Sequence, residues 1–90
     1  MPPDAGRAAE QVARQSYGKL IAFLAARSRD VPAAEDALSE ALASALRVWP
    51  ERGVPDKPEA WLLVAARRNL MQAARHRTVA ANAQTTITVA

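Results

Sequence analysis

The sequence predicts an all-α domain, a compact bundle of three helices, or of four if the connecting loop adds a short helical turn. Two features of composition favour this class: half of the residues are hydrophobic, many of them alanine, and only 4% are aromatic. Alanine has the highest helix propensity, and the β-branched residues that favour strands are sparse until the last few positions. The third feature is length, because 90 residues suffice for one small domain and not for two.

The composition also excludes several classes of protein. The chain has no cysteine, which rules out disulfides, thiolate metal sites and cysteine nucleophiles. No apolar run is long enough to span a bilayer, and residues 1–11 are too polar for a secretory signal, so we expect a cytoplasmic protein. The net charge of +3 is only mildly basic, so the placement of the charges must indicate the partner.

The first helix is predicted over residues 5–28. Asp4 can cap the free amides of its opening turn. Gly18 is a tolerated weak point on its polar side. The apolar side that we expect to pack in the core consists of Ala9, Val12, Ala13, Leu20, Phe23 and Leu24.

The second helix is predicted over residues 32–49. Asp30 can cap it, Pro32 suits its first turn, and Pro50 is expected to end it because proline cannot donate the next helical hydrogen bond. Asp36, Glu40 and Arg47 should point away from the core. The core side consists of Ala34, Leu38, Ala41, Leu42, Ala45 and Trp49.

A loop over residues 50–57 and a third helix over residues 58–77 should follow. The loop holds two prolines and a glycine, and Pro58 suits the first turn of the helix. The predicted core side of this helix consists of Leu62, Leu63, Ala66, Leu70 and Ala73.

Residues 78–90 carry no charge and are rich in Thr and Val. We expect a linker or a truncated tail there, since one isolated strand cannot form a stable sheet.

The opposite face of the third helix is unusual for a solubilising surface. It consists of Trp61, Val64, Ala65, Arg68, Gln72 and Arg75. Arginine contacts phosphate and an aromatic ring contacts unstacked bases, so this face is a plausible surface for nucleic acid. The alternative is an ordinary exposed helix face on which Trp61 packs under the loop, against Val54 and Pro55.

Catalysis is not predicted, and no cofactor or metal is expected. His76 is the only histidine and falls among arginines, with no nucleophile or acid at a recognisable spacing. Glu35, Asp36 and Glu40 on the second helix lack a histidine partner, so a solvated acidic face is the better interpretation than a metal site. The helices therefore present two polar surfaces of opposite sign.

Two stretches resemble a known family. The run AEDALSEAL (34–42), followed after a loop by AWLLVAARRNLMQAARHR (60–77), resembles region 2 of the extracytoplasmic-function (ECF) sigma factors, a group of the sigma-70 family. That group shows an AED-L-x-QE helix, a loop, and an AWL-x-x-x-ARN-x-x-x-D-x-x-RR helix. The resemblance covers residues 12–77. It departs from the pattern at Ser39, at Arg68 with Asn69 one place on, and at Gln72, which puts base preference in doubt more than DNA binding.

The resemblance implies a non-enzymatic module for transcription initiation with two partners. The acidic helix would dock on the coiled-coil of the largest catalytic subunit of RNA polymerase, through Glu35, Asp36, Ser39, Glu40 and Leu46. The last helix and the loop over residues 51–57 would engage the non-template strand of the promoter minus-ten element, with one base flipped under the loop. The implied DNA-binding residues are Arg52, Lys57, Trp61, Val64, Arg67, Arg68, Gln72 and Arg75.

The sequence also predicts further partners and leaves one alternative function. An anti-sigma factor or a C-terminal regulatory domain would fit the same resemblance. No helix-turn-helix that could read a minus-thirty-five element follows Arg77, so we expect either a fragment of a larger factor or an incomplete initiation factor. The rival is a small helical protein-interaction module without DNA binding. An orphan helix-turn-helix is disfavoured because the gap between the last two helices far exceeds a three-to-four-residue turn.

Overall fold

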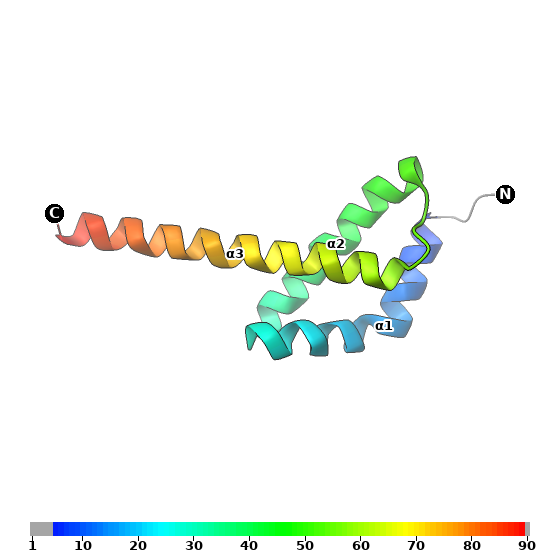
Figure 1. The fold of residues 1–90 in the computed structure, drawn as a ribbon, viewed down its shortest axis with the longest axis horizontal. Helices are drawn as coiled ribbons and strands as arrows, with labels where there is room; N and C mark the ends of the chain where they lie inside the picture. The colour runs from blue at the N-terminus through cyan, green and yellow to red at the C-terminus, as the bar shows by residue number, and fades with distance from the viewer. Residues whose placement is uncertain (1–4, 90) are drawn as a thin grey trace.

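Three helices make up the chain in the computed structural model, which describes the backbone of residues 5–89 and the side chains of residues 5–79. They are α1 (Ala5–Ser28), α2 (Val31–Arg52) and α3 (Pro58–Val89). Within residues 5–89 there is no strand, so the all-α prediction is confirmed (Figure 1). Asp4, the expected cap of α1, lies outside the described residues.

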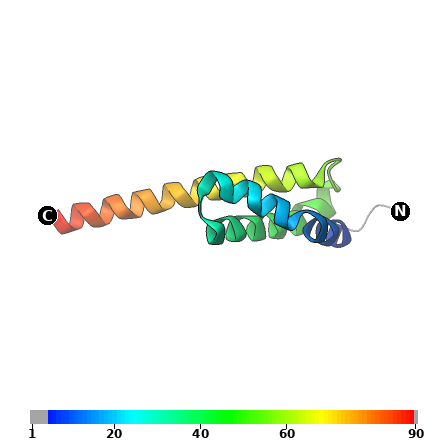
Figure 2. The ribbon, with the colours of Figure 1, turned by 90° about the horizontal axis from the view of Figure 1, so that it is seen from below.

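The three helices pack on one another near the start of α3, and the rest of α3 projects beyond them. Each pair of helices is in contact, with α1 and α2 lying along the first half of α3 (Figures 1 and 2). The longest dimension of the molecule is 62 Å and its radius of gyration is 16.0 Å. A globular chain of this length would have a radius of gyration of about 12 Å. The projecting helix accounts for the difference.

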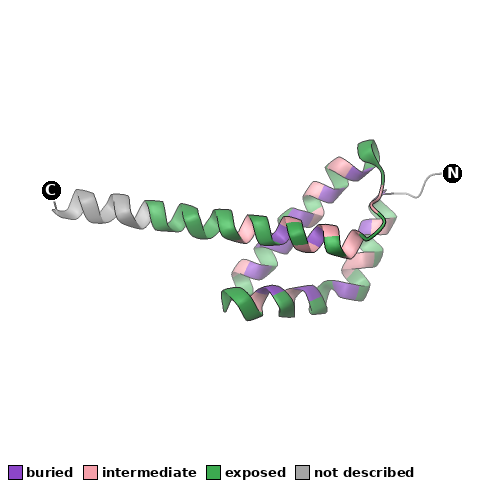
Figure 3. Cartoon of the chain, in the orientation of Figure 1, coloured by how far each residue is buried: buried purple, intermediate pink, exposed green. Residues whose placement is uncertain are grey.

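The core lies where the helices cross (Figure 3). Its largest fully buried side chains are Leu24 of α1, Leu38 and Trp49 of α2, and Leu62 of α3. Alanines at the contacts allow the helix backbones to approach closely. Fully buried alanines are Ala34, Ala41, Ala45 and Ala66. The predicted core sides of α2 and α3 are therefore largely confirmed.

Two residues expected in the core are exposed. The Phe23 ring is 43% exposed, and the Arg27 guanidinium lies 5.3 Å from its centroid, a cation–π contact at the end of α1. Ala73 is exposed, since it lines an open groove beside Asp36 and Glu40 of α2 and is not covered by a neighbouring helix. These two assignments were wrong because a helical wheel gives the direction of a side chain and not the length over which a neighbouring helix covers it.

The turn between α1 and α2 follows the predicted capping. The Asp30 carboxylate accepts a hydrogen bond of 3.0 Å from the amide of Ala33, so its role as N-cap is confirmed. Arg29 has a φ of 56°, a left-handed conformation unusual for a residue with a side chain, and its amide donates to the carbonyl of Ala25 at 2.6 Å. This single residue reverses the chain between the two helices.

The predicted end of α2 at Trp49 is wrong, because the helix continues through Pro50 to Arg52. Proline at this position deprives only the carbonyl of Leu46 of its usual donor, and Leu46 lies on the exposed side of the helix. The amide of Gly53 then closes the last turn by donating to the carbonyl of Trp49 at 2.7 Å. The connecting loop is consequently shorter than predicted and spans residues 53–57.

The predicted end of α3 at Arg77 is also wrong. The helix continues to Val89, so residues 78–89 are helical in backbone, and residue 90 lies outside the described residues. That this stretch is a linker or a truncated tail stays a prediction. Neither glycine nor proline occurs after Pro58. The Thr78 hydroxyl donates to the carbonyl of Ala74 at 3.0 Å, so the polar group of this β-branched residue has a hydrogen-bond partner within the helix.

Candidate functional site

The clearest hollow on the predicted DNA-binding face lies at the start of α3. It has a volume of about 370 Å³ and is lined by Ala60, Trp61, Val64, Ala65 and Arg68. Val64 is 54% exposed and Arg68 is exposed, whereas Trp61 is half-buried. The structure therefore brings together three of the predicted DNA-binding residues: an indole, an aliphatic side chain and a guanidinium.

Trp61 is more buried than the other predicted DNA-binding residues, all of which are exposed. Its ring meets that of Trp49 edge to face, with centroids 5.3 Å apart and planes at 70°. Trp49 itself is 2% exposed, so one indole is core and the other borders solvent. Val54 of the loop and Trp61 are both half-buried and pack against the same core. Trp61 therefore lies on the face opposite the core as predicted, but it is half-buried and partly covered by Trp49.

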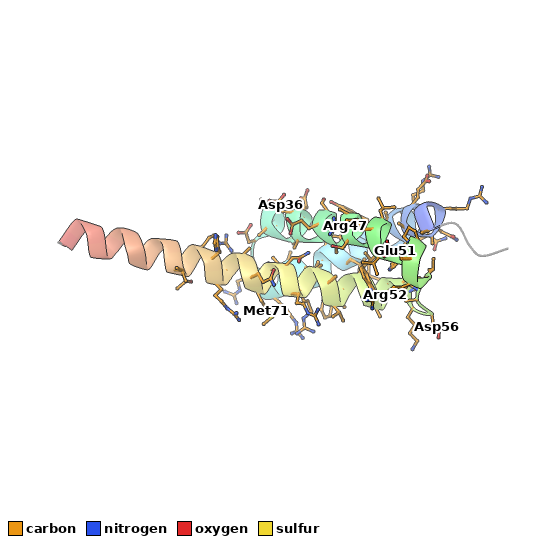
Figure 4. The ribbon with its side chains drawn as sticks, turned by 90° about the horizontal axis from the view of Figure 1, so that it is seen from above. Asp36, Arg47, Glu51, Arg52, Asp56 and Met71 are labelled. Atoms are coloured by element: carbon orange, nitrogen blue, oxygen red, sulfur yellow. The ribbon has the colours of Figure 1, made fainter. Side chains whose placement is uncertain are left out.

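The remaining predicted DNA-binding residues are exposed but do not form one site. Gln72 and Arg75 continue along α3 beyond the hollow. Arg67 lines a separate groove against α1. Arg52 belongs to the last turn of α2 (Figure 4). Lys57 is the last residue of the loop. The basic character of this region therefore extends over more than one side of α3.

The loop between these last two residues depends on Gly53. Its φ of 92° and ψ of 156° fall in a region of backbone space that is essentially restricted to glycine. A β-carbon there would meet no atom within 4 Å, so the requirement for glycine comes from the backbone conformation and not from crowding. Gly53 thus sets the direction in which the short loop leaves α2 toward the hollow.

The acidic surface of α2 is exposed throughout. Asp36 and Glu40 line a groove of about 220 Å³ between α2 and α3, together with Leu70, Ala73 and Arg77. The other predicted polymerase-binding residues lie outside this groove. They are Glu35, Ser39 and the 52% exposed Leu46. Asp36 and Arg47 lie along one edge of the molecule in Figure 4.

The acidic and basic surfaces do not neutralise each other. Among residues 5–79, ion pairs join Arg14 to Glu10 at 2.9 Å, Lys19 to Glu59 at 3.1 Å, and Arg77 to Asp30 at 3.7 Å. Within that same part of the chain, the carboxylates of α2 that were predicted to bind polymerase take part in none of these pairs. Both surfaces keep their charge for a partner.

Asn69 joins the two surfaces. In the sequence it stood out only as the motif asparagine displaced by one place. The side-chain amide of Asn69 in α3 donates to the carbonyl of Ala37, near the start of α2, at 3.1 Å. Asn69 follows Arg68 in the chain, and Ala37 follows Asp36. This bond fixes the rotation of the basic face of α3 relative to the acidic face of α2. The available signal was an amide side chain within a run of mostly apolar and basic residues.

A second polar contact anchors the start of α3 on α1. The hydroxyl of Ser16, which is buried, donates to Glu59 at 2.6 Å, and the Lys19 ammonium lies 3.1 Å from the other carboxylate oxygen. The hydrogen bond from Ser16, and after it that from Lys19, lower the pKa of Glu59 from 4.5. The contact holds the first turn of α3 and the adjoining loop in place.

This carboxylate should make stability depend on pH. Because the pKa of Glu59 is lower in the folded state, its contribution is fully present above pH 4.5 and is lost as the pH falls through the lowered value. We expect Glu59→Gln to reduce the free energy of unfolding near pH 7, with the difference from wild type vanishing in acid. Urea denaturation at several pH values measures this. A constant difference down to about pH 3, below the ordinary carboxyl pKa, would contradict it.

Neither a metal-binding cluster nor a membrane-spanning helix occurs in the part of the chain that the structure describes. No group of three or more His, Cys, Asp or Glu residues that could hold a metal occurs within the described part of the chain. His76 is exposed on the projecting part of α3. Within the same described part, none of the helices combines the length and the apolar character needed to cross a membrane. The surfaces on α2 and α3 therefore remain the candidates for function.

Comparison with known proteins identifies one family. The family model for sigma-70 region 2 matches residues 12–79, which contain almost all of the packed part of the molecule and both charged surfaces. No curated protein and no solved structure gives a significant match.

Proposed function

The chain belongs to the sigma-70 region 2 family, and from this premise we propose that it is the polymerase-docking and promoter-melting module of an ECF-type sigma factor. Region 2 of sigma factors binds the RNA polymerase core and takes part in promoter recognition during transcription initiation. It does so by binding and not by chemistry. The ECF assignment rests on the AED and AWL motifs and their separation in the sequence.

One observation carries the proposal: an unpaired acidic surface and a basic, aromatic surface lie on adjacent helices joined by a hydrogen bond. Asp36 of α2 and Arg68 of α3 each precede a partner in the Asn69–Ala37 contact. A module that anchors on one macromolecule while it holds another needs such a fixed relation between two surfaces. We assign the acidic surface to the polymerase coiled-coil and the basic surface to the minus-ten element.

The hollow at the start of α3 suits an opened DNA strand. A base removed from its stack loses contact with its neighbours, and the exposed side of the Trp61 ring offers a replacement. Because Trp61 is already held against Trp49, little side-chain entropy remains to be lost when a base packs on it. Arg68 in the hollow and Arg75 further along α3 would contact phosphates. Preference for single strands over duplex would favour melting.

Gln72, Arg67, Arg52 and Lys57 complete the proposed DNA-binding set. Arg52 and Lys57 flank the loop, where they would meet the strand on either side of the base that the loop accepts. Arg67 would contribute mainly through its charge, because it faces the α1 side of α3. An anti-sigma factor or a C-terminal regulatory domain would be a further partner of such a factor.

Polymerase binding provides the test of the acidic surface. We expect Asp36→Ala or Glu40→Ala to weaken binding of the chain to RNA polymerase core by about tenfold, since truncating one member of a complementary charge pair costs on the order of 1.4 kcal/mol. Both side chains are exposed, so folding should be unchanged. Titration of labelled chain with core enzyme measures the affinity.

Glu10→Ala is the matched control, because it removes one exposed carboxylate from α1 on another part of the surface. It should leave core binding within about twofold of wild type, as exposed charges away from an interface contribute little. If all three variants bind core enzyme equally, α2 is not the docking surface. If wild type binds neither core enzyme nor single-stranded minus-ten oligonucleotides, the chain is a protein-interaction module of another kind.

A further inference from the structure

A groove between the end of α1 and the middle of α3 shares only Arg67 with the residues of the proposed function. It has a volume of about 270 Å³ and is lined by Leu24, Arg27, Ser28, Arg67, Leu70 and Met71. The Leu24 side chain is buried and forms its floor, Leu70 is half-buried, and Met71 is 59% exposed. Asp36 on α2 and Met71 on α3 lie on opposite sides of the molecule in Figure 4. This groove is therefore a surface separate from the acidic face of α2.

The apolar surface continues outward from the groove. Phe23 precedes Leu24 on α1 and is 43% exposed, although its position on the helix was predicted to be core. The Arg27 guanidinium rests on the Phe23 ring at 5.3 Å, so the cation and the aromatic face are held at one edge of the groove. Arg67 and Met71, one helical turn apart, form the other wall. Large apolar side chains are thus left uncovered between two guanidinium groups.

The charge around the groove has one sign. Between Glu10 and Asp30 of the chain, and again everywhere after Glu59, there is no acidic residue. The nearest carboxylate in sequence, Asp30, caps α2 and lies 3.7 Å from Arg77. Neither Arg27 nor Arg67 takes part in an ion pair among residues 5–79. An occupant of this groove would have to be both apolar and anionic.

That combination favours a protein helix over nucleic acid. A DNA or RNA strand would satisfy the two arginines with phosphates but would leave the Leu24, Leu70 and Met71 surface without an apolar partner. An amphipathic helix places apolar side chains one turn apart along one face and can carry carboxylates on both flanks. Methionine adapts its shape to such a face. A helix laid between α1 and α3 would cover the apolar floor and pair with both guanidinium groups.

We propose that the α1–α3 groove is the docking site for an acidic amphipathic helix of a partner protein. The site shares Arg67 with the proposed DNA-binding set and is otherwise distinct from the surfaces assigned to polymerase and promoter DNA, so the groove does not depend on either assignment. Arg67 lines this groove and does not line the hollow around Trp61.

A synthetic peptide tests the proposal. The probe is a fluorescein-labelled amphipathic peptide of about 18 residues, long enough to form a helix, with leucines on one face and glutamates on its flanks. A second peptide carries lysine at every glutamate position. The full chain is titrated against each by fluorescence anisotropy, and against a labelled single-stranded oligonucleotide. We expect the acidic peptide to bind at least about tenfold more tightly than the basic one, as charge complementarity requires.

The variants compare two exposed apolar residues of α3. Met71→Glu should weaken acidic-peptide binding by about tenfold or more, by repulsion and lost contact. Val79→Glu makes the same change at a residue that is 61% exposed and lies two turns further along, and should change it less than about twofold. Arg27→Gln should weaken binding without introducing an acid, and circular dichroism should show unchanged helix content for all three.

These titrations can support or overturn the proposed helix-binding role of the groove. The proposal is overturned if the acidic peptide does not saturate, if both peptides bind equally, or if Met71→Glu and Val79→Glu have equal effects. It is also overturned if Met71→Glu and Arg27→Gln weaken oligonucleotide binding and not peptide binding, which would make the groove a nucleic-acid surface. Failure of the chain to bind core enzyme or oligonucleotide would contradict the proposed function and leave this result intact.

Discussion

Replacing Trp49 by alanine is expected to lower the free energy of unfolding by about 3–5 kcal/mol, the usual cost of removing a large aromatic side chain from a core. Trp49 is the largest fully buried residue, at 2% exposure, and it contacts Trp61 edge to face. A domain of this size has a total stability on the order of 5–10 kcal/mol. The substitution should therefore bring the chain close to unfolding at room temperature.

Trp49→Phe provides the matched control. It keeps an aromatic ring in the core and removes the indole Nε1, which is buried without a hydrogen-bond partner among the described residues. An unsatisfied buried donor costs about 1–3 kcal/mol, so its removal should offset part of the lost packing. We expect Trp49→Phe to cost clearly less than Trp49→Ala. Urea denaturation followed by circular dichroism measures both, and equal costs would show that the Nε1 finds a partner.

The Trp49→Phe variant also makes it possible to monitor Trp61 in the hollow. In Trp49→Phe, Trp61 is the one remaining tryptophan and reports directly on its own surroundings by fluorescence. If the Trp61 ring is held by its neighbour in the core, its emission should stay close to that of a half-buried indole. It should then change when a single-stranded minus-ten oligonucleotide is added. If an oligonucleotide binds without altering this emission, Trp61 does not contact the strand.

The second large effect is expected for the double variant Arg68→Gln with Arg75→Gln. Loss of two phosphate contacts should weaken binding of a single-stranded minus-ten oligonucleotide by about 10- to 100-fold at low salt, because those contacts release counterions from the strand. The slope of log affinity against log salt should fall in magnitude by about 1.4, or roughly 0.7 for each lost contact. Both arginines are exposed, so the fold should not change.

The control removes the same net charge elsewhere. Arg7→Gln with Arg14→Gln alters two exposed arginines on the first half of α1, away from the hollow. This variant should keep nearly the whole salt slope. If both double variants reduce the slope equally, binding reflects the overall positive charge of the chain, and the assignment of Arg68 and Arg75 to the strand fails.

Much of the candidate site could be located from the sequence, but its shape could not. The periodicity of α2 and α3 identified Asp36, Glu40, Val64 and Arg68 as outward-facing, and the structure places all four on the surface. Their grouping was not predictable. Periodicity does not reveal that Arg68 shares a hollow with Trp61 while the adjacent Arg67 faces α1. Which of these residues bind DNA or polymerase stays a prediction.

The errors have a common cause. Proline and a charge-free Thr- and Val-rich stretch were taken as local stop signals, yet Pro50 lies inside the last turn of α2, and α3 continues to Val89. One missing hydrogen bond at an exposed carbonyl is a small cost beside the packing of Trp49 and the closing bond from Gly53. Local preferences are weak terms, and packing can override them.

The amino-acid sequence by itself determined the helices, their apolar sides, the Asp30 cap and the opposite charges of α2 and α3, because these depend on residues within a few positions of one another. Only the tertiary structure decided how the surfaces are joined. The contact of Asn69 with Ala37 spans 32 positions in sequence, and that of Ser16 with Glu59 spans 43. Such pairs meet only after the alanine-lined helices have packed, so no local pattern records them.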